Sequence, residues 1–257
     1  MVPRWVIAAA LYRELKGLHT ILEEPAPHSV PRGNLWSGYA EGVPVFLART
    51  GIGGRKARGL CEYVLGNFPC KGIISIGYAG SLKEGIRIGD VLIAEEVMLL
   101  AQSGGKAFTT DPHLRKVAHK TISSQCPGRV FSGRMLSVNS VVASAQEKRS
   151  LGALYSALAV EMESGALAEL AQAFELPFLT IRTISDDVST SLPDYDRIRG
   201  FRGPKRYPHL LSYLLRHPGD LRAMARMRVF AHVATRALTR SVRAFLRRLE
   251  QHAPSPN

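Results

Sequence analysis

Two acidic segments, Val160-Glu161-Met162-Glu163-Ser164 and Ile181-Arg182-Thr183-Ile184-Ser185-Asp186, lie about twenty residues apart in this chain. Each closes an apolar, β-rich run, and a small-residue or turn segment follows it. Open α/β sheets bind their ligands at the carboxyl ends of the strands. The position of these carboxylates therefore predicts an active site at the carboxyl ends of the strands.

Apolar and β-branched runs alternate with helical patterns through the first 190 residues. Strands are expected at 5–10, 43–49, 73–78, 91–97, 130–138, 157–163 and 178–185, and helices at 11–22, 54–67, 111–122, 145–152 and 164–175. Several of the strands lack polar alternation, which is typical of strands covered on both faces. The order predicts an α/β fold whose central sheet is largely parallel or mixed, with helices on both faces.

The composition is that of a soluble globular protein. The chain has 257 residues, 46% of them hydrophobic, with a mean hydropathy of -0.02. The apolar start of the chain meets Tyr12 and Arg13 too early for a signal peptide or a membrane span. Cys61, Cys70 and Cys126 form no CxxC pair, and no histidine is spaced with them as a ligand. We expect a reduced, cytoplasmic protein without a metal or other cofactor.

The net charge of +13 is unevenly distributed. Fourteen of the 34 Lys and Arg residues lie between Arg197 and Arg248, against the single acid Asp220, and the rest of the chain holds equal numbers of bases and acids. We therefore expect a catalytic domain at 1–195 and a basic helical tail at 196–257. A nucleic-acid enzyme more often spreads its bases around the cleft, so no nucleic acid is expected as a partner.

Two glycine-rich turns follow successive strands. Gly51-Ile52-Gly53-Gly54 precedes a helix, where free backbone N–H groups can face an anion or a ribose oxygen, and Gly77-Tyr78-Ala79-Gly80 ends the next strand. Either segment alone can be a tight turn, because glycine is the usual residue at positive φ. Two such turns at neighbouring strand ends favour a ligand site.

Five segments carry a family resemblance. They are Ala10-Leu-Tyr-Arg-Glu14, Thr50-Gly-Ile-Gly53, Ile76-Gly-Tyr-Ala-Gly80 followed by Ile88-Gly-Asp-Val91, Val160-Glu-Met-Glu163 and Arg182-Thr-Ile-Ser-Asp186. In this order, over residues 4 to 190, they resemble the purine and uridine phosphorylase superfamily. The nucleosidase branch, with methylthioadenosine/S-adenosylhomocysteine nucleosidases and futalosine hydrolase, is the most similar. The resemblance implies a nucleoside phosphorylase-type three-layer fold.

Cleavage of an N-glycosidic bond passes through an oxocarbenium-like sugar, so it needs an acid for the departing base, groups that hold the ribose, and a base for water. The resemblance implies that Asp186 donates toward N7 of a purine, Glu163 holds the 2′ and 3′ hydroxyls, and Glu14 orients the water. The substrate-binding residues that it implies are Met162, Ala79, Gly80, Tyr78, Leu136 and Gly53.

Each acid also has a structural interpretation. Glu163 could complement the dipole of the helix that follows it, and Asp186 could stabilise a turn. Glu14 could be an ordinary first-turn acid of an amphipathic helix. No chemical role is predicted for Glu161.

The chain departs from the family pattern at two positions. Tyr78 stands where many members carry a small hydroxyl residue that touches phosphate or water, and Leu136 stands where an aromatic side chain often stacks on the base. Glu14 also replaces the segment that phosphorylases use there. These departures favour hydrolysis, although Arg49, Arg55 or Arg182 could contact a phosphate, so a phosphorylase stays an alternative. A non-catalytic module that binds nucleosides or nucleic acid is another alternative.

The tail contains a basic amphipathic helix. Apolar residues recur at helical spacing from Leu221 to Leu249 beside a stripe of arginines, after a proline-broken linker and a short helix at about 209–216. The apolar stripe could pack on the body or on a partner subunit. It could instead insert shallowly into an anionic membrane while the arginines bind its surface.

This tail resembles that of the hopanoid-biosynthesis members of the superfamily, which remove adenine from adenosylhopane. The resemblance implies a lipid-linked nucleoside as substrate and peripheral attachment at the inner membrane face. On this interpretation, deletion of the residues after about 200 weakens action on a lipid-linked nucleoside more than on methylthioadenosine. Related proteins are often dimers, so a homodimer is expected.

Overall fold

A computed structural model of the chain describes residues 2–101, 104–191 and 218–249, and side-chain contacts for these ranges except residues 101 and 218–228. The strands are β1 (Arg4–Ala9), β2 (Glu23–His28), β3 (Asn34–Ala40), β4 (Val43–Arg49), β5 (Cys70–Ser81), β6 (Val91–Ala101), β7 (Gly104–Thr109), β8 (Val130–Ser137), β9 (Ala159–Glu161) and β10 (Phe178–Asp186). The helices are α1 (Tyr12–His19), α2 (Gly54–Asn67), α3 (Pro112–Gln125), α4 (Ala145–Tyr155), α5 (Ser164–Ala173) and α8 (Pro218–Leu249).

The strands form one mixed sheet, in the order β10-β6-β8-β9-β5-β1-β4-β3-β2, with β7 paired to β6. β10 also pairs in parallel with β5, so β5, β10, β6, β8 and β9 close into a ring. β1, β5 and β10 run parallel to one another, which brings their carboxyl ends to the same edge of the sheet. That edge is where the acidic segments of the sequence end.

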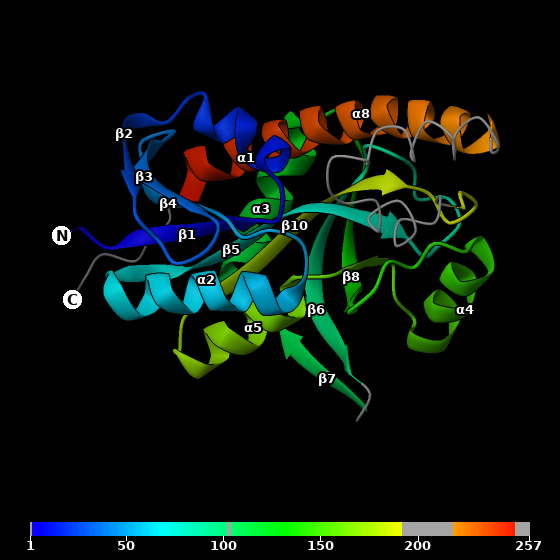
Figure 1. The fold of residues 1–257 in the computed structure, drawn as a ribbon, viewed down its shortest axis with the longest axis horizontal. Coiled ribbons are helices and arrows are strands. Elements are labelled where there is room, and N and C mark those ends of the chain that lie inside the picture. Colours follow the sequence, from blue (N-terminus) through cyan, green and yellow to red (C-terminus); the bar gives the residue numbers. More distant parts are fainter. Residues whose placement is uncertain (1, 102–103, 192–217, 250–257) are drawn as a thin grey trace, which may run out of the picture.

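Helices cover the sheet on both faces, as the alternation of the chain predicts (Figure 1). On one face, α2 and α5 pack on a buried cluster that includes Val6 and Ala8 of β1. On the other face, α1, α3 and α8 pack on a cluster that includes Ile7 and Ala9 of β1. Successive side chains of a strand point to opposite faces, so an uninterrupted apolar strand such as β1 requires two helical layers. The predicted three-layer α/β fold is confirmed.

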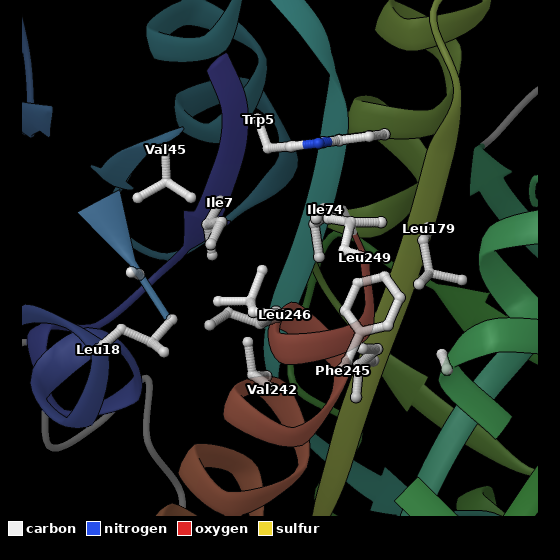
Figure 2. Close-up of a cluster of buried hydrophobic side chains, with 14 of the residues drawn as sticks. Trp5, Ile7, Leu18, Val45, Ile74, Leu179, Val242, Phe245, Leu246 and Leu249 are labelled. Carbon is white, nitrogen blue, oxygen red and sulfur yellow. The ribbon is translucent and has the colours of Figure 1, made fainter. Parts of the chain in front are cut away.

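The C-terminal half of α8, which lies within the predicted basic tail at 196–257, packs on the rest of the fold. Leu238, Val242, Phe245, Leu246 and Leu249 of α8 are at most 5% exposed and pack in the same core as strands β1, β4 and β5 (Figure 2). The C-terminal half of α8 is therefore part of the main core. Its apolar stripe is not available to insert into a bilayer.

Other parts of the tail prediction lie outside the described residues. The linker and the short helix at about 209–216 belong to these, and so do the side chains of Leu221 and Met224. Among the described helices, none combines the length and the hydropathy needed to cross a membrane.

Candidate active site

A cavity of about 230 Å³ lies at the carboxyl ends of β1, β5, β9 and β10. It is lined by Ala10, Leu11, Arg13, Glu14, Ile52, Tyr78, Ala79, Gly80, Val138, Ser140, Val141, Val142, Val160, Glu161, Met162, Glu163, Ser185 and Asp186. The three predicted catalytic acids, which come from segments far apart in the sequence, thus share one cavity.

The glycines at the end of β5 make room for two of these acids. A Cβ atom on Gly77 would lie 2.9 Å from Oε1 of Glu14, and one on Gly80 would lie 2.7 Å from Oδ2 of Asp186. Real Cβ atoms do not approach other heavy atoms so closely, and Glu14 and Asp186 would have to move. The Gly-Tyr-Ala-Gly turn therefore serves the site by letting two carboxylates approach the backbone.

Glu14 is held by two backbone donors. Its Oε2 accepts a hydrogen bond from the N–H of Leu11 at 2.7 Å, and its Oε1 accepts one from the N–H of Tyr78 at 3.1 Å. Burial raises the pKa of Glu14 above its usual range, while these backbone bonds and the charge of Arg182 oppose the rise. A buried carboxyl that is fixed in position and has a raised pKa is suited to accept a proton.

Glu161 has a structural role that the sequence did not reveal. Its carboxylate accepts from the backbone N–H groups of Glu163 and Ser164 at the start of α5, and Nη2 of Arg182 donates to its Oε2 at 2.6 Å. Nη2 of Arg182 also donates to the hydroxyls of Ser75 and Ser164. This buried network fixes the turn between β9 and α5, and so the place of Glu163.

Glu163 stands at the N-cap position of α5, but its side chain makes no cap bond with the helix. Its Oε1 accepts from the N–H of Gly53 at 2.7 Å, so the first glycine turn holds this acid. Burial raises the pKa of Glu163 to about 7, and the neighbouring Glu161 carboxylate adds to the rise. The carboxyl group, pointing into the cavity rather than capping its helix, is free to bind a ligand.

Asp186 ends β10 with both carboxylate oxygens engaged. The hydroxyl of Ser185 donates to Oδ1 at 2.7 Å, and Nζ of Lys148 donates to Oδ2 at 2.6 Å. Lys148 lies on α4 and is fully buried. It had no signal in the sequence, because a lysine in the run Gln146-Glu147-Lys148-Arg149 is typical of a solvated helix face.

Not every predicted binding residue lines the cavity. Met162, Tyr78, Ala79 and Gly80 do. Leu136 does not: it is fully buried behind the cavity, in a cluster with Val142 and Val160, and the residue of this segment that reaches the cavity is Val138. Gly53 also lies outside the lining and acts through its N–H bond to Glu163. Among the described residues, no group of three His, Cys, Asp or Glu side chains could hold a metal ion.

Known proteins resemble this chain in sequence over most of its length. Residues 4–197 match the model of the phosphorylase superfamily. The chain is 28% identical, over 194 residues, to a 5′-methylthioadenosine/S-adenosylhomocysteine nucleosidase of Actinobacillus succinogenes, with 70% of this chain and 84% of that protein covered. It is 30% identical, over 169 residues, to a nucleosidase of the same name from Baumannia cicadellinicola, with 60% and 73% covered.

Solved structures show the same fold at lower identity. A 5′-methylthioadenosine/S-adenosylhomocysteine nucleosidase from Neisseria meningitidis, in complex with methylthio-immucillin-A, superposes with a TM-score of 0.77 at 20% identity and covers 96% of this chain and 99% of its own. Futalosine hydrolase of Helicobacter pylori superposes with a TM-score of 0.75 at 17% identity, with 95% and 97% covered. From the match over residues 4–197 we conclude that the chain belongs to the phosphorylase superfamily.

Proposed function

We propose that this protein is a purine nucleosidase that releases adenine from a 5′-substituted adenosine by hydrolysis. The observation that carries the proposal is that Glu14, Glu163 and Asp186 line one cavity although 172 residues separate the first from the last. Both curated relatives described above are named 5′-methylthioadenosine/S-adenosylhomocysteine nucleosidases. Their names and the chemistry of the three acids support the same reaction.

Each acid has a task in this reaction. Asp186 protonates N7 of the adenine while the bond between C1′ and N9 breaks, Glu163 binds the ribose hydroxyls, and Glu14 takes the proton of the attacking water. Ser185 fixes an oxygen of Asp186, Gly53 one of Glu163 and Leu11 one of Glu14. These oxygens do not need to reorganise during the reaction, and such preorganisation is the main source of catalytic power in sites of this kind.

Arg182 supplies a second group for the water. Its Nε and Nη1 are buried without a hydrogen-bond partner among the described residues. Nη1 lies 3.5 Å from the position that a Cβ on Gly77 would take, and Oε1 of Glu14 lies 2.9 Å from the same point. We propose that the nucleophilic water accepts from Arg182 while it donates to Glu14.

The charge of the cavity favours water over phosphate as the nucleophile. Four carboxylates line it, and Arg13 is the cation among the described lining residues. Glu161 and Asp186 pair with the buried Arg182 and Lys148, whereas Glu14 and Glu163 are held by backbone N–H groups. Neither Arg49 nor Arg55 lines the cavity. A phosphate dianion would be repelled by this arrangement.

An assay of free adenine from methylthioadenosine, with and without inorganic phosphate, tests the proposal. A hydrolase releases adenine at the same rate in both arms and produces free methylthioribose. Release that requires phosphate and yields a ribose 1-phosphate would instead make the protein a phosphorylase. No base released from any 5′-modified adenosine would favour a non-catalytic binding module.

The cavity has an apolar part that suits a hydrophobic 5′ substituent. Its members are Leu11, Ile52, Val138, Val141, Val142 and Val160. We propose a lipid-linked adenosine, adenosylhopane, as the substrate class, on this lining and on the tail resemblance. Across a series of 5′-alkylthio adenosines, kcat/KM should rise with chain length; a maximum at methyl would exclude a lipid-linked substrate.

The charge of α1, α3 and α8 supports attachment to an anionic membrane. Ten Lys and Arg side chains on these helices, none of them buried, form what we call the cationic face: Arg13, Lys16, Arg115, Lys116, Lys120, Arg236, Arg240, Arg243, Arg247 and Arg248. The described side chains of the same helices include one acid, the buried Glu14. Glu41 pairs with Arg243 and Arg247. Each cation near a bilayer contributes about 1 kcal/mol, without insertion of the buried stripe.

Cosedimentation with vesicles tests this attachment. The protein should bind vesicles that contain phosphatidylserine and not pure phosphatidylcholine, and 0.5 M salt should release it. Arg236→Gln with Arg240→Gln should weaken binding, while Arg55→Gln with Arg58→Gln on α2, across the sheet, should not. Equal losses in both double variants, or binding to duplex DNA in preference to vesicles, would exclude a specific membrane face.

A homodimer is also part of the proposal. The β6–β7 hairpin extends away from the body (Figure 1), and β7 pairs only with β6 among the described strands. An exposed strand edge is a common site of association. Light scattering on the purified protein should give twice the mass of 28.1 kDa, and the monomer mass would contradict the proposal.

A further inference from the structure

Lys148 is placed unlike any other residue of its helix. All of α4 is described, and Lys148 is its one buried residue, with a side-chain exposure of 0%. An amphipathic helix usually buries its apolar residues and exposes its lysines, because an ammonium group loses its hydration when it is buried. The burial of the lysine instead of an apolar neighbour indicates a specific task.

The ammonium group has an acceptor for each of its three protons. Nζ donates to Oδ2 of Asp186 at 2.6 Å, to the carbonyl of Asp187 at 3.1 Å and to the carbonyl of Thr190 at 2.8 Å. A lysine has three donors and no acceptor, so this set is complete. The set also ties α4 to the end of β10 and to the turn after it.

The turn that supplies the two carbonyls is itself held in place. The hydroxyls of Ser189 and Thr190 both donate to Oδ1 of Asp187. The Asp186 carboxylate lies between Ser185 on one oxygen and Lys148 on the other, and Gly80 leaves the space beside it open. Of these partners, Lys148 is the one that carries a charge.

We propose that Lys148 is the positioning residue of the leaving-group acid, and this inference rests on the function proposed above. When the bond between C1′ and N9 breaks, its electron pair goes to the adenine, and N7 takes the proton of the Asp186 carboxyl. Asp186 is then a buried carboxylate, and the Lys148 ammonium stabilises it. The water oxygen bonds to C1′ and its proton passes to Glu14. Glu14 releases a proton to solvent and Asp186 takes one up, so both groups return to their starting state.

Two leaving groups separate this role from a merely structural one. Adenine must be protonated to depart, whereas 4-nitrophenolate departs without a proton. For Lys148→Met, which keeps the unbranched stem up to Cε and removes the charged ammonium group, kcat on methylthioadenosine should fall about 10²-fold or more. On the 4-nitrophenyl 5-methylthioriboside, kcat should stay within about threefold of the native value, because that reaction bypasses Asp186.

Two further variants complete the experiment. Arg149→Met is the matched control on α4, because Arg149 is half exposed and pairs with the exposed Glu84, and it should leave both reactions unchanged. In Lys148→Ala, added methylamine should restore adenine release by supplying an ammonium group to Asp186. Rescue of Lys148→Ala by methylamine tests the role of the ammonium group even if Lys148→Met folds poorly.

Equal losses on both substrates without rescue by methylamine, or no loss on either, would overturn the inference. The two levels of proposal fail differently. If the native protein releases no adenine, both the proposed nucleosidase function and the proposed role of Lys148 are wrong. If the native protein releases adenine and Lys148→Met releases it equally fast, the role of Lys148 alone is wrong.

Discussion

At the scale of single residues, the site combines groups that touch the cavity with groups that hold them. Glu161 and Arg182 form a buried ion pair at 2.6 Å, with side chains 1% and 2% exposed. The Glu161 carboxylate also accepts from backbone N–H groups, and Nη2 of Arg182 also donates to the hydroxyls of Ser75 and Ser164. The family resemblance implied the roles of Glu163 and Asp186, of which Asp186 ends β10 and Glu163 is the N-cap residue of α5. The sequence could not assign Glu161, because a carboxylate that faces an arginine and one that faces a substrate look alike in a sequence.

The ion pair gives a prediction on stability. Arg182→Met leaves the Glu161 charge buried without its partner, which should lower the free energy of unfolding by about 3–5 kcal/mol. Arg58→Met removes the half-exposed pair with Glu169 and should cost no more than about 1 kcal/mol. Urea denaturation of both variants measures the difference. Equal losses of unfolding free energy would show that the buried pair of Glu161 and Arg182 stabilises the fold no more than an exposed pair does.

The raised pKa of Glu163, about 7 against an ordinary 4.5, predicts a dependence of stability on pH. Between these two values the folded protein binds the proton that the unfolded chain releases, so this group's contribution to stability is lost as pH rises through about 7. Glu163→Gln cannot ionise and keeps an acceptor for Gly53. It should therefore be more stable than the native protein at pH 8, by up to about 3 kcal/mol, and this gain should vanish at pH 4. Thermal unfolding across this range checks both ends, and a gain that does not change with pH would contradict the assignment.

At the scale of elements, the end of β5 shapes the site and the helix α8 completes the core. Successive strands of the predicted α/β order do end together, which is why glycine turns and acids from distant segments meet. The sequence missed β2, β3 and β7. β2 is an edge strand with exposed side chains and two prolines, and such a strand has neither an apolar run nor β-favouring residues to mark it.

The glycine at the end of β5 gives a prediction on activity. Gly80→Ala places a Cβ where Oδ2 of Asp186 lies, so the acid must shift, and adenine release should fall about 10²-fold. The fold should survive, because the conflict is with the end of one side chain. Gly59→Ala on α2 is the control, since a Cβ there meets nothing within 4 Å, and it should be neutral or slightly stabilising. Full activity in Gly80→Ala would show that the place of Asp186 is not critical.

The packing of α8 gives a prediction on the core. Phe245→Ala should lower the free energy of unfolding by about 3–5 kcal/mol, as expected for a fully buried aromatic side chain. Val233→Ala on the same helix, 43% exposed, should stay within about 0.5 kcal/mol. Denaturant titrations of the two variants decide the point. Similar small losses of unfolding free energy in both variants would show that α8 does not contribute to the stability of the core.

At the scale of the whole molecule, the three layers and the shared strand ends follow from alternation and apolar runs, and these were predictable. The place of α8 was not, because an amphipathic helix offers the same apolar stripe to a core, a partner or a membrane. The structure assigns the stripe from Leu238 to Leu249 to the core. Deletion of the residues after about 200 should therefore destabilise the fold and reduce activity on every substrate alike. The cationic face stays on the outside, and the vesicle experiment therefore uses arginine substitutions.

The rate of adenine release by Asp186→Asn tests whether this residue is the leaving-group acid. This change keeps the shape of the side chain and removes its proton-donating carboxyl. We expect kcat on methylthioadenosine to fall about 10²-fold or more in a variant that still folds, although its thermal unfolding temperature should drop because the buried Lys148 ammonium loses its charged partner. A variant that folds normally and releases adenine at the native rate would contradict this role.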